Sequence, residues 1–326
     1  MRKCIALSML VMLTNACWVG PVGWVAAGFH DGRGDTCYRK GDYDCAIREY
    51  SQAIDLMPRF AVAFNNRGLA YEAKGNHDRA IQDFSEAIRL QPAYVLAYHN
   101  RARAYLQHGD YDRALQDYDA VIRLRPHSAE AFHYRGIVYA IKGEHERAIQ
   151  DYDRAIRLNP NLWSAYHSRG LARFNLGQFS EAREDFSTAM HNSNFSYTAI
   201  WLYLATARAG QRNTAELTKN AAELDPAKWP APVIQFYLGT ISADQLFQAA
   251  NNADSKKQNE QYCEAYFYLG ESALLRGKKA DAGRQIEQAA ATCPTNFIES
   301  AAAKAELARM NVTKATAAKQ HSAAVP

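Results

Sequence analysis

Apolar and aromatic residues recur along most of this chain at steps of three and four, the spacing of one buried face on an α-helix. Residues 95–128 illustrate the pattern, with Ala102 and Tyr105 in a first stretch and Ala114 and Tyr118 in a second. Each stretch is long enough for three to four helical turns. The pattern therefore predicts two helices that pack against each other through one apolar stripe each.

The same pattern returns every 34 residues, which is the signature of a repeat protein. The positions that keep this step are Ala46, Ala80, Ala114, Ala148 and Ala182; Gly41, Gly75, Gly109, Gly143 and Gly177; Pro58, Pro92, Pro126 and Pro160; and the aromatic Tyr50, Phe84, Tyr118, Tyr152 and Phe186. The glycine lies between the two helices, where a positive φ ends the first helix, and the proline ends the second. Five units are predicted, at 27–60, 61–94, 95–128, 129–162 and 163–196.

The 34-residue repeat becomes weak after residue 196, but the pattern typical of helices continues. Helices are expected around 197–209, 212–223, 230–238 and 242–251, followed by a further repeat-like unit at 263–296 and a last helix at 297–309. A polar stretch at 251–259 is expected to separate the helix at 242–251 from the unit at 263–296. Residues 311–326 have no periodicity and predict a disordered tail. The domain plan is thus a five-unit array over 28–196, a helical region over 197–310 and the tail.

The small–aromatic–small–proline pattern at this period resembles the tetratricopeptide-repeat (TPR) family. The resemblance implies an all-α fold, a right-handed α-solenoid of antiparallel helix pairs, here with a C-terminal TPR-like helical extension. It also implies that the protein binds other proteins or peptides. In the first unit His30 and Cys37 replace the usual aromatics of the first helix, so this unit is expected to act as a cap.

A second resemblance lies in the C-terminal region. Its segments are WLYLA at 201–205, FYLGTIS at 236–242, AYFYLG at 265–270 and NF at 296–297. They are similar to the C-terminal part of the bacterial new lipoprotein I family, periplasmic TPR lipoproteins that bind a tail-specific protease and murein endopeptidases. This resemblance implies an envelope adaptor whose partners include a periplasmic protease or murein hydrolases, and it is compatible with a homodimer. The chain departs from that family in its longer N-terminal array.

The first 27 residues are typical of an export signal, which predicts a periplasmic protein. Arg2 and Lys3 precede an apolar run at 4–13, and small residues follow. Ordinary cleavage after Ala27 competes with a lipobox-like ending at Cys17, which would make that cysteine a lipid anchor. An uncleaved membrane anchor is the third alternative.

Composition narrows the function further. Hydrophobic residues make up 48% and charged residues 22%, as in soluble globular proteins, and this argues against bulk disorder. The formal net charge of +4 falls to +2 without Arg2 and Lys3, so no nucleic-acid partner is expected. The stretch GEHER at 143–147 is not a metalloprotease motif, and neither a nucleophile elbow nor a phosphate loop occurs.

Three classes of function follow from these patterns. A non-catalytic adaptor that needs no cofactor is the first hypothesis, and a structural subunit of an envelope secretion or outer-membrane biogenesis complex is the second. An enzyme with an unrecognised site in 197–262 is the third.

Four cysteines follow the signal region. Cys37 and Cys45 fall at matched heights on the two helices of the first unit, and Cys263 and Cys293 do so in the last unit. Both pairs are therefore expected within the ~7 Å between Cα atoms that a disulfide allows. Two disulfides are expected in an exported chain, and four buried thiols are the alternative.

The fifth position of successive units forms a polar column: Asn65, His99, His133 and His167. On a helical wheel this column lies away from the packing stripe, on the face that lines the peptide-binding groove of TPR proteins. Arg103, one turn after His99, could hold a carboxylate there. The column predicts either a peptide-recognition ladder or a solvated groove. A metal site is not expected, because helices ~8–10 Å apart cannot bring one histidine each within ~2 Å of an ion.

The seventh position of the units carries arginine, and the twenty-third position carries a carboxylate at the same height. The predicted ion-pair ladder consists of Arg67, Arg101, Arg135 and Arg169 with Asp83, Asp117, Asp151 and Asp185. A planar guanidinium suits a carboxylate, and a partly buried one requires a partner. Ligand-anchoring arginines are the alternative.

Overall fold

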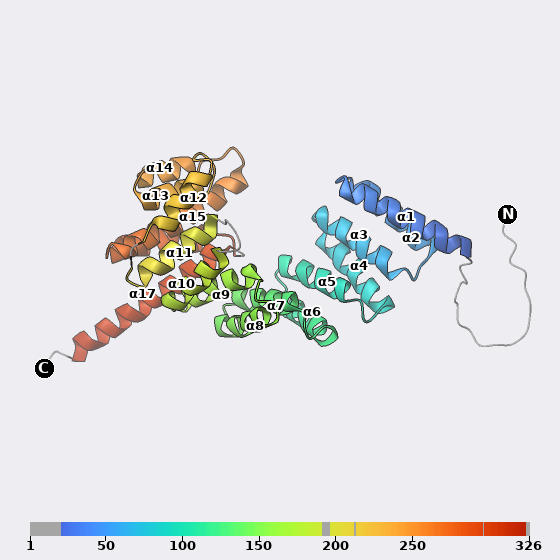
Figure 1. The fold of residues 1–326 in the computed structure, drawn as a ribbon, viewed down its shortest axis with the longest axis horizontal. Helices are drawn as coiled ribbons and strands as arrows, with labels where there is room; N and C mark the ends of the chain where they lie inside the picture. Colours follow the sequence, from blue (N-terminus) through green and yellow to red (C-terminus); the bar gives the residue numbers. More distant parts are fainter. Residues whose placement is uncertain (1–20, 191–195, 212, 296, 324–326) are drawn as a thin grey trace, which may run out of the picture. The chain divides into compact units, whose positions relative to one another are not determined.

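The structure is a computed structural model that describes residues 21–190, 196–211, 213–295 and 297–323. These residues form seventeen α-helices and no strand (Figure 1), so the predicted all-α fold is confirmed. The chain divides into two compact units, residues 1–110 and 111–326. From here on, these two are called the first and the second unit, and one helix pair is called a repeat. Each unit is described separately.

The first unit holds two complete helix pairs and one further helix. Its elements are α1 (Pro21–Arg39), α2 (Tyr43–Leu56), α3 (Ala61–Ala73), α4 (His77–Leu90) and α5 (Val95–Gln107). Helix α1 packs against α2 and α3 against α4. From α2 on, these helices agree with the predicted repeat units to within a few residues, whereas α1 begins at Pro21, before the expected start at 27.

The second unit begins with repeats and ends with a denser helical region. Its elements are α6 (Tyr111–Leu124), α7 (Ala129–Ile141), α8 (His145–Leu158), α9 (Trp163–Asn175), α10 (Phe179–Met190), α11 (Ser196–Arg208), α12 (Ala215–Glu223), α13 (Ala231–Leu238), α14 (Ala243–Ala249), α15 (Ser255–Leu275), α16 (Lys279–Thr292) and α17 (Ile298–Ala323). The pairs α7/α8, α9/α10 and α15/α16 each pack helix against helix. The expected repeat-like unit near the C-terminus is therefore present as α15 and α16.

Two glycine positions explain the shape of the α7/α8 pair. Gly143, between α7 and α8, has a φ of +79°, which a residue with a side chain rarely adopts. Gly136 lies under the ring of Tyr152, and a Cβ atom added there would come 2.6 Å from ring carbon Cε1. The first glycine lets the chain reverse, and the second lets the two helices approach closely.

One apolar core joins the last repeat to the C-terminal helices. Trp201 of α11 is fully buried and contacts Phe174 of α9 at a ring-centroid distance of 5.1 Å and Phe267 of α15 at 5.5 Å. The expected border between residues 196 and 197 is therefore not a packing boundary. Repeat periodicity ends there, but burial continues across it.

The C-terminal tail differs from its prediction. Residues 311–326 were expected to be disordered, whereas helix α17 continues to Ala323. The prediction depended on the absence of an amphipathic pattern. Alanine, lysine and glutamine nevertheless have high helix propensity, and no glycine or proline interrupts this stretch before Pro326. The polar stretch at 251–259 is also shorter than expected, because Asp254 caps α15 by accepting from the backbone N–H of Lys256 at 2.9 Å.

The predicted signal region lies mostly outside the described residues, and Cys17 lies there with it. Helix α1 begins at Pro21 and passes through the expected cleavage site after Ala27, a residue that is fully buried. Cleavage at that point would remove the start of α1, so the signal peptide stays a prediction. None of the helices in the described ranges reaches the length and hydropathy of a transmembrane span.

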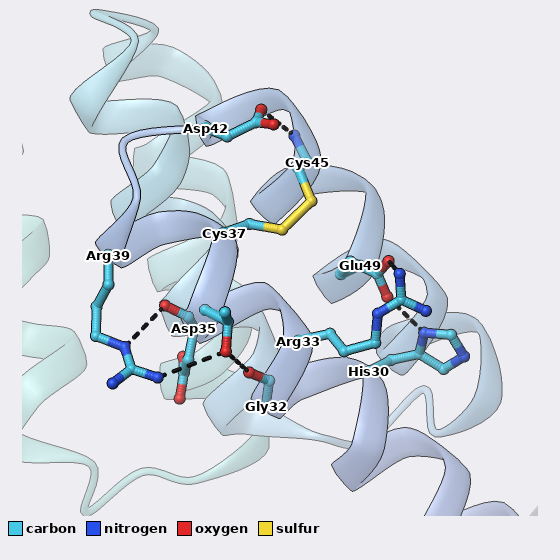
Figure 2. Close-up of a disulfide and its surroundings, with 10 residues drawn as sticks. His30, Gly32, Arg33, Asp35, Cys37, Arg39, Asp42, Cys45 and Glu49 are labelled. Carbon is cyan, nitrogen blue, oxygen red and sulfur yellow. Dashed lines mark hydrogen bonds and ion pairs between the residues drawn. A yellow bond between two sulfur atoms is a disulfide. The ribbon is translucent and has the colours of Figure 1, made fainter.

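Both predicted disulfides are present. Cys37 of α1 bonds to Cys45 of α2 with the Cα atoms 5.7 Å apart (Figure 2), and Cys263 of α15 bonds to Cys293 at 4.8 Å. In the first pair of helices, His30 and Arg33 also converge on Glu49, at 2.7 and 2.9 Å. Arg33 and Glu49 stand 34 residues before Arg67 and Asp83, so the capping repeat forms the same arginine–carboxylate pair, with His30 as a further partner of Glu49.

Loss of the second disulfide is expected to destabilise the protein more than loss of the first. The Cys263–Cys293 bridge spans a sequence separation of 30, whereas the Cys37–Cys45 bridge spans only 8. The Cys263–Cys293 bridge therefore closes the longer loop in the unfolded chain. Urea unfolding of C263A/C293A should show a loss of ~2–4 kcal/mol relative to the parent. A larger loss in C37A/C45A would contradict this order. The parent in reductant is the control, because it loses both bridges without a change in side-chain volume.

Candidate functional site

The arginine column forms a ladder that also connects successive repeats. In the first unit, Arg67 binds Asp83 through two hydrogen bonds of 2.8 Å and donates to Ser51 of the preceding helix pair at 3.0 Å. In the second unit, Arg135 binds Asp151 at 2.7 and 2.8 Å and Asp119 at 2.6 Å. Each arginine thus holds one partner within its own repeat and one in the repeat before it.

The remaining members of this ladder follow the same rule inside their units. Arg169 binds Asp185 at 2.6 Å and Asp153 at 2.5 Å, and Arg101 donates to Ser85 at 3.0 Å. Asp117, the predicted partner of Arg101, belongs to the second unit. The partners in the preceding repeat (Ser51, Ser85, Asp119 and Asp153) were not expected from the sequence, although they recur every 34 residues.

In the polar column at the fifth position, Asn65 and His133 are buried, whereas His99 and His167 are half-buried, so the column is less open than expected. His133 is 8% exposed, and its Nε2 atom lies 3.1 Å from the Ser168 hydroxyl of α9. His167 has its Nδ1 atom 3.0 Å from the Thr198 hydroxyl of α11. In the first unit Asn65 is buried and accepts a hydrogen bond of 2.9 Å from Asn100.

These contacts pair the first helices of neighbouring repeats, so packing does require the column. The helical wheel placed this column on an open face because it considers one helix alone. In the structure, the first helix of the following repeat packs against this position.

Burial also changes the acid–base behaviour that the column was expected to show. Loss of solvation lowers the pKa of both His133 and His167 to about 4. For His99, burial and the positive charge of Arg103 lower the pKa as well. His133 and His167 therefore stay neutral between pH 7.5 and 5.5, and the expected gain of positive charge there does not occur. Arg103 binds Glu72 of its own unit at 3.1 Å.

A cavity of about 400 Å³ opens beside His167 in the second unit. It is lined by residues of α9, α11 and α15 and by the start of α17: Trp163, His167, Tyr197, Thr198, Glu264, Phe297, Ile298 and Glu299. Helices α9 and α15 are the first helices of their pairs, so the cavity lies on the face where TPR proteins carry their groove. Most of its wall is apolar or aromatic, and its acidic groups are two glutamates.

Both glutamates are buried and hydrogen-bonded to neutral donors. Glu264 accepts from the Trp229 indole at 2.8 Å and from the Tyr197 hydroxyl at 3.3 Å. Glu299 accepts from the Tyr268 hydroxyl at 2.8 Å. Burial and the negative charge of Glu299 raise the pKa of Glu264 to about 8, and burial raises the pKa of Glu299. The site is therefore partly protonated at neutral pH and can gain negative charge when a cation arrives.

The sequence contains an indication of this site, namely two glutamates within or next to apolar stretches, but the repeat pattern does not single them out. Glu264 stands inside the apolar run 263–269, and Glu299 follows Phe297 and Ile298. A carboxylate in an apolar stretch is rarely buried without a partner, and this marks it as a site candidate. Among the described residues, no group of histidine, cysteine, aspartate and glutamate side chains could hold a metal ion.

Comparison with known proteins supports both resemblances. The Lipoprotein NlpI homolog of Haemophilus influenzae is 30% identical to this chain over 132 residues, which are 40% of this chain and 42% of the relative. The chain thus matches less than half of that relative's length. This agrees with the resemblance to the new lipoprotein I family and leaves the relative's activity outside what is shown.

Two solved structures show the fold alone, because their sequence identity is low. A tetratricopeptide-repeat protein from Parabacteroides merdae matches 86% of this chain and 98% of its own, with a TM-score of 0.55 and 16% identity. The pilF protein of Pseudomonas aeruginosa matches 67% of this chain and 99% of its own, with a TM-score of 0.57 and 14% identity.

Family models identify the repeats themselves. Tetratricopeptide-repeat models match residues 34–75, 61–94, 99–162 and 137–222. Together these segments cover more than half of the chain, and the pairs α3/α4, α7/α8 and α9/α10 lie within them. The chain belongs to the tetratricopeptide-repeat family.

Proposed function

We propose that this protein is a non-catalytic adaptor of the bacterial envelope that binds a partner protein in the cavity between α9, α11, α15 and α17. The repeat family supports a protein-binding scaffold, since stacked helix pairs present extended surfaces to other chains. The name of the Haemophilus influenzae relative, a lipoprotein, supports the envelope. A periplasmic protease or a murein hydrolase is the proposed partner.

The cavity is the observation that carries this proposal. Its wall combines apolar area with a few polar groups, as ligand sites in proteins usually do. His133 of the histidine column is buried between repeats, whereas His167 lines the cavity together with Trp163, Tyr197 and Phe297, which are partly accessible. A peptide segment of a partner can therefore reach an aromatic surface that the repeats themselves leave uncovered.

Site-specific photocrosslinking in living bacterial cells that express the protein tests the proposal. A photoreactive phenylalanine analogue replaces Ile298, which is 40% exposed at the cavity, and in a control it replaces Gln288, which is exposed on α16. We expect a partner band at Ile298 that is absent at Gln288, and mass spectrometry should identify a soluble protease or cell-wall hydrolase.

Two results would contradict the proposal. Crosslinks at Gln288 but not at Ile298 would exclude the cavity as the docking site. Stoichiometric crosslinks to an integral membrane complex would favour the structural-subunit hypothesis over the adaptor.

A further inference from the structure

We infer that the cavity binds the cationic end of a lysine or arginine side chain of the partner, with Glu264 and Glu299 as its counter-ions. This inference rests on the proposed function, and it specifies the chemistry of the segment that docks. It follows from three properties of the cavity: two buried carboxylates without an ion-pair partner among the described residues, aromatic walls, and a size suited to one long side chain.

The carboxylates of the cavity differ from the other buried carboxylates of the second unit. Asp151 and Asp185 bind arginines in the ladder, and Glu271 binds Arg208 at 2.8 Å. In the described part of the chain, Glu264 and Glu299 form no ion pair, and the side chains that donate hydrogen bonds to them are those of tyrosine and tryptophan. Two buried carboxyl groups beside one cavity without a cation leave room for one that a ligand supplies.

The walls suit the rest of a basic side chain. Trp163, Tyr197 and Phe297 line the same cavity as the carboxylates. Aromatic faces attract ammonium and guanidinium groups, and they also pack against the methylene stem that carries the charge. The volume of about 400 Å³ accommodates one extended side chain with its backbone, and a folded domain could not enter it.

Binding of such a cation should release a proton at neutral pH. Without a bound cation, Glu264 holds a proton because burial and Glu299 raise its pKa to about 8. A bound cation stabilises the ionised carboxylate and lowers that pKa, so the proton leaves.

Other titratable groups that face the pair would not mask this release. His167 stays neutral because burial lowers its pKa to about 4, and burial holds the pKa of Tyr197 and Tyr268 above its usual value. Glu260 adds a further negative charge that raises the pKa of Glu264.

Calorimetry with small probes tests the inference without knowledge of the partner. The probes are the Nα-acetyl methylamides of lysine and arginine, and the neutral controls are the matching derivatives of Nε-acetyl-lysine and citrulline. We expect the cationic probes to bind at least about tenfold more tightly than the neutral ones. Titration at pH 7 in buffers of different ionisation enthalpy should show proton release.

Variants assign the binding to the two carboxylates. E264Q/E299Q should weaken the lysine probe at least about tenfold, because glutamine keeps the shape and a hydrogen-bond acceptor but removes the charge. E216Q/E287Q is the matched control, since it removes the same charge from two exposed positions of the second unit and should bind as the parent does. Melting curves verify that each variant is folded.

The inference is overturned if lysine and Nε-acetyl-lysine probes bind the parent equally, a comparison that needs no variant. Undiminished binding of the lysine probe to folded E264Q/E299Q overturns it too. If the crosslink at Ile298 then persists, the adaptor proposal stands and only the cationic assignment fails. If that crosslink is also absent in the parent, the proposed function fails independently.

Discussion

Replacement of Arg208 by alanine is expected to lower the free energy of unfolding by about 3–5 kcal/mol, the range for a buried charge that loses its partner. Arg208 of α11 donates to Glu271 of α15 at 2.8 Å and to Glu306 of α17 at 2.8 Å. Its guanidinium also lies 4.4 Å from the ring centroid of Phe179 of α10. One side chain thus joins four helices of the second unit.

Glu271 explains why the loss is large. It is 0% exposed, and one of its carboxylate oxygens already lacks a hydrogen-bond partner. Glu306 would keep Arg309 after the substitution, but among the described residues Glu271 has Arg208 alone as an ion-pair partner. The alanine variant would remove the ion pair of this buried carboxyl group, and the charge of Arg309 would remain as a cause that lowers its pKa.

The loss should depend on pH. Even with Arg208 present, burial and the charge of Glu306 raise the pKa of Glu271 from 4.5 to about 7. Without Arg208 the folded state would hold that proton to higher pH, while the unfolded state still releases it near 4.5. Stability of the variant should therefore fall as pH rises from about 4.5, and its deficit against the parent should be larger at pH 8 than at pH 5.

Denaturant unfolding at these two pH values measures the effect, and two further variants control it. R208A/E271Q should recover part of the loss, because the orphaned charge is gone. R284A removes an arginine that is 71% exposed and, among the described residues, pairs only with Asp281 on its own helix, so it should change stability by less than about 1 kcal/mol. Equal losses in R208A and R284A would show that the buried network does not hold the helices together.

Features that depend on one repeat could be predicted from the sequence. The positive φ of Gly143 and the pairing of Cys263 with Cys293 both follow from the positions of residues within one helix pair. The carboxylate partner of Arg135 in its own repeat follows in the same way, because Asp151 stands sixteen residues later at the same height. Local periodicity fixes such contacts, since the two helices of a pair are neighbours in sequence.

Contacts between repeats, and those of the C-terminal region, could not be predicted in this way. His133 was placed on an open face, but Ser168 of the next repeat covers it. Glu264 and Glu299 are 35 residues apart on α15 and α17, and no ladder connects them. Their juxtaposition depends on how α11, α15 and α17 fold around Trp201, which periodicity does not specify.

Replacement of Arg135 by alanine is expected to cost about 2–4 kcal/mol, somewhat less than the Arg208 variant because the site is less completely buried. Arg135 is 21% exposed, and Asp151, its partner through two hydrogen bonds, is 8% exposed. The hydrogen bond with Asp151 is the main cause that raises the pKa of the Arg135 guanidinium, so the arginine stays charged. Removing it would also release Asp119 of the preceding repeat.

Chemical denaturation of R135A, R135K and R135A/D151N separates charge from geometry. R135K should recover only part of the loss, because an ammonium group cannot bind Asp151 through a planar fork and reach Asp119 as well. R135A/D151N should be more stable than the sum of its single losses, since each substitution removes the same contact. If R135A instead unfolds within about 0.5 kcal/mol of the parent, the arginine contributes nothing measurable to folding. The column would then be free to bind a ligand, which is the alternative that the sequence left open.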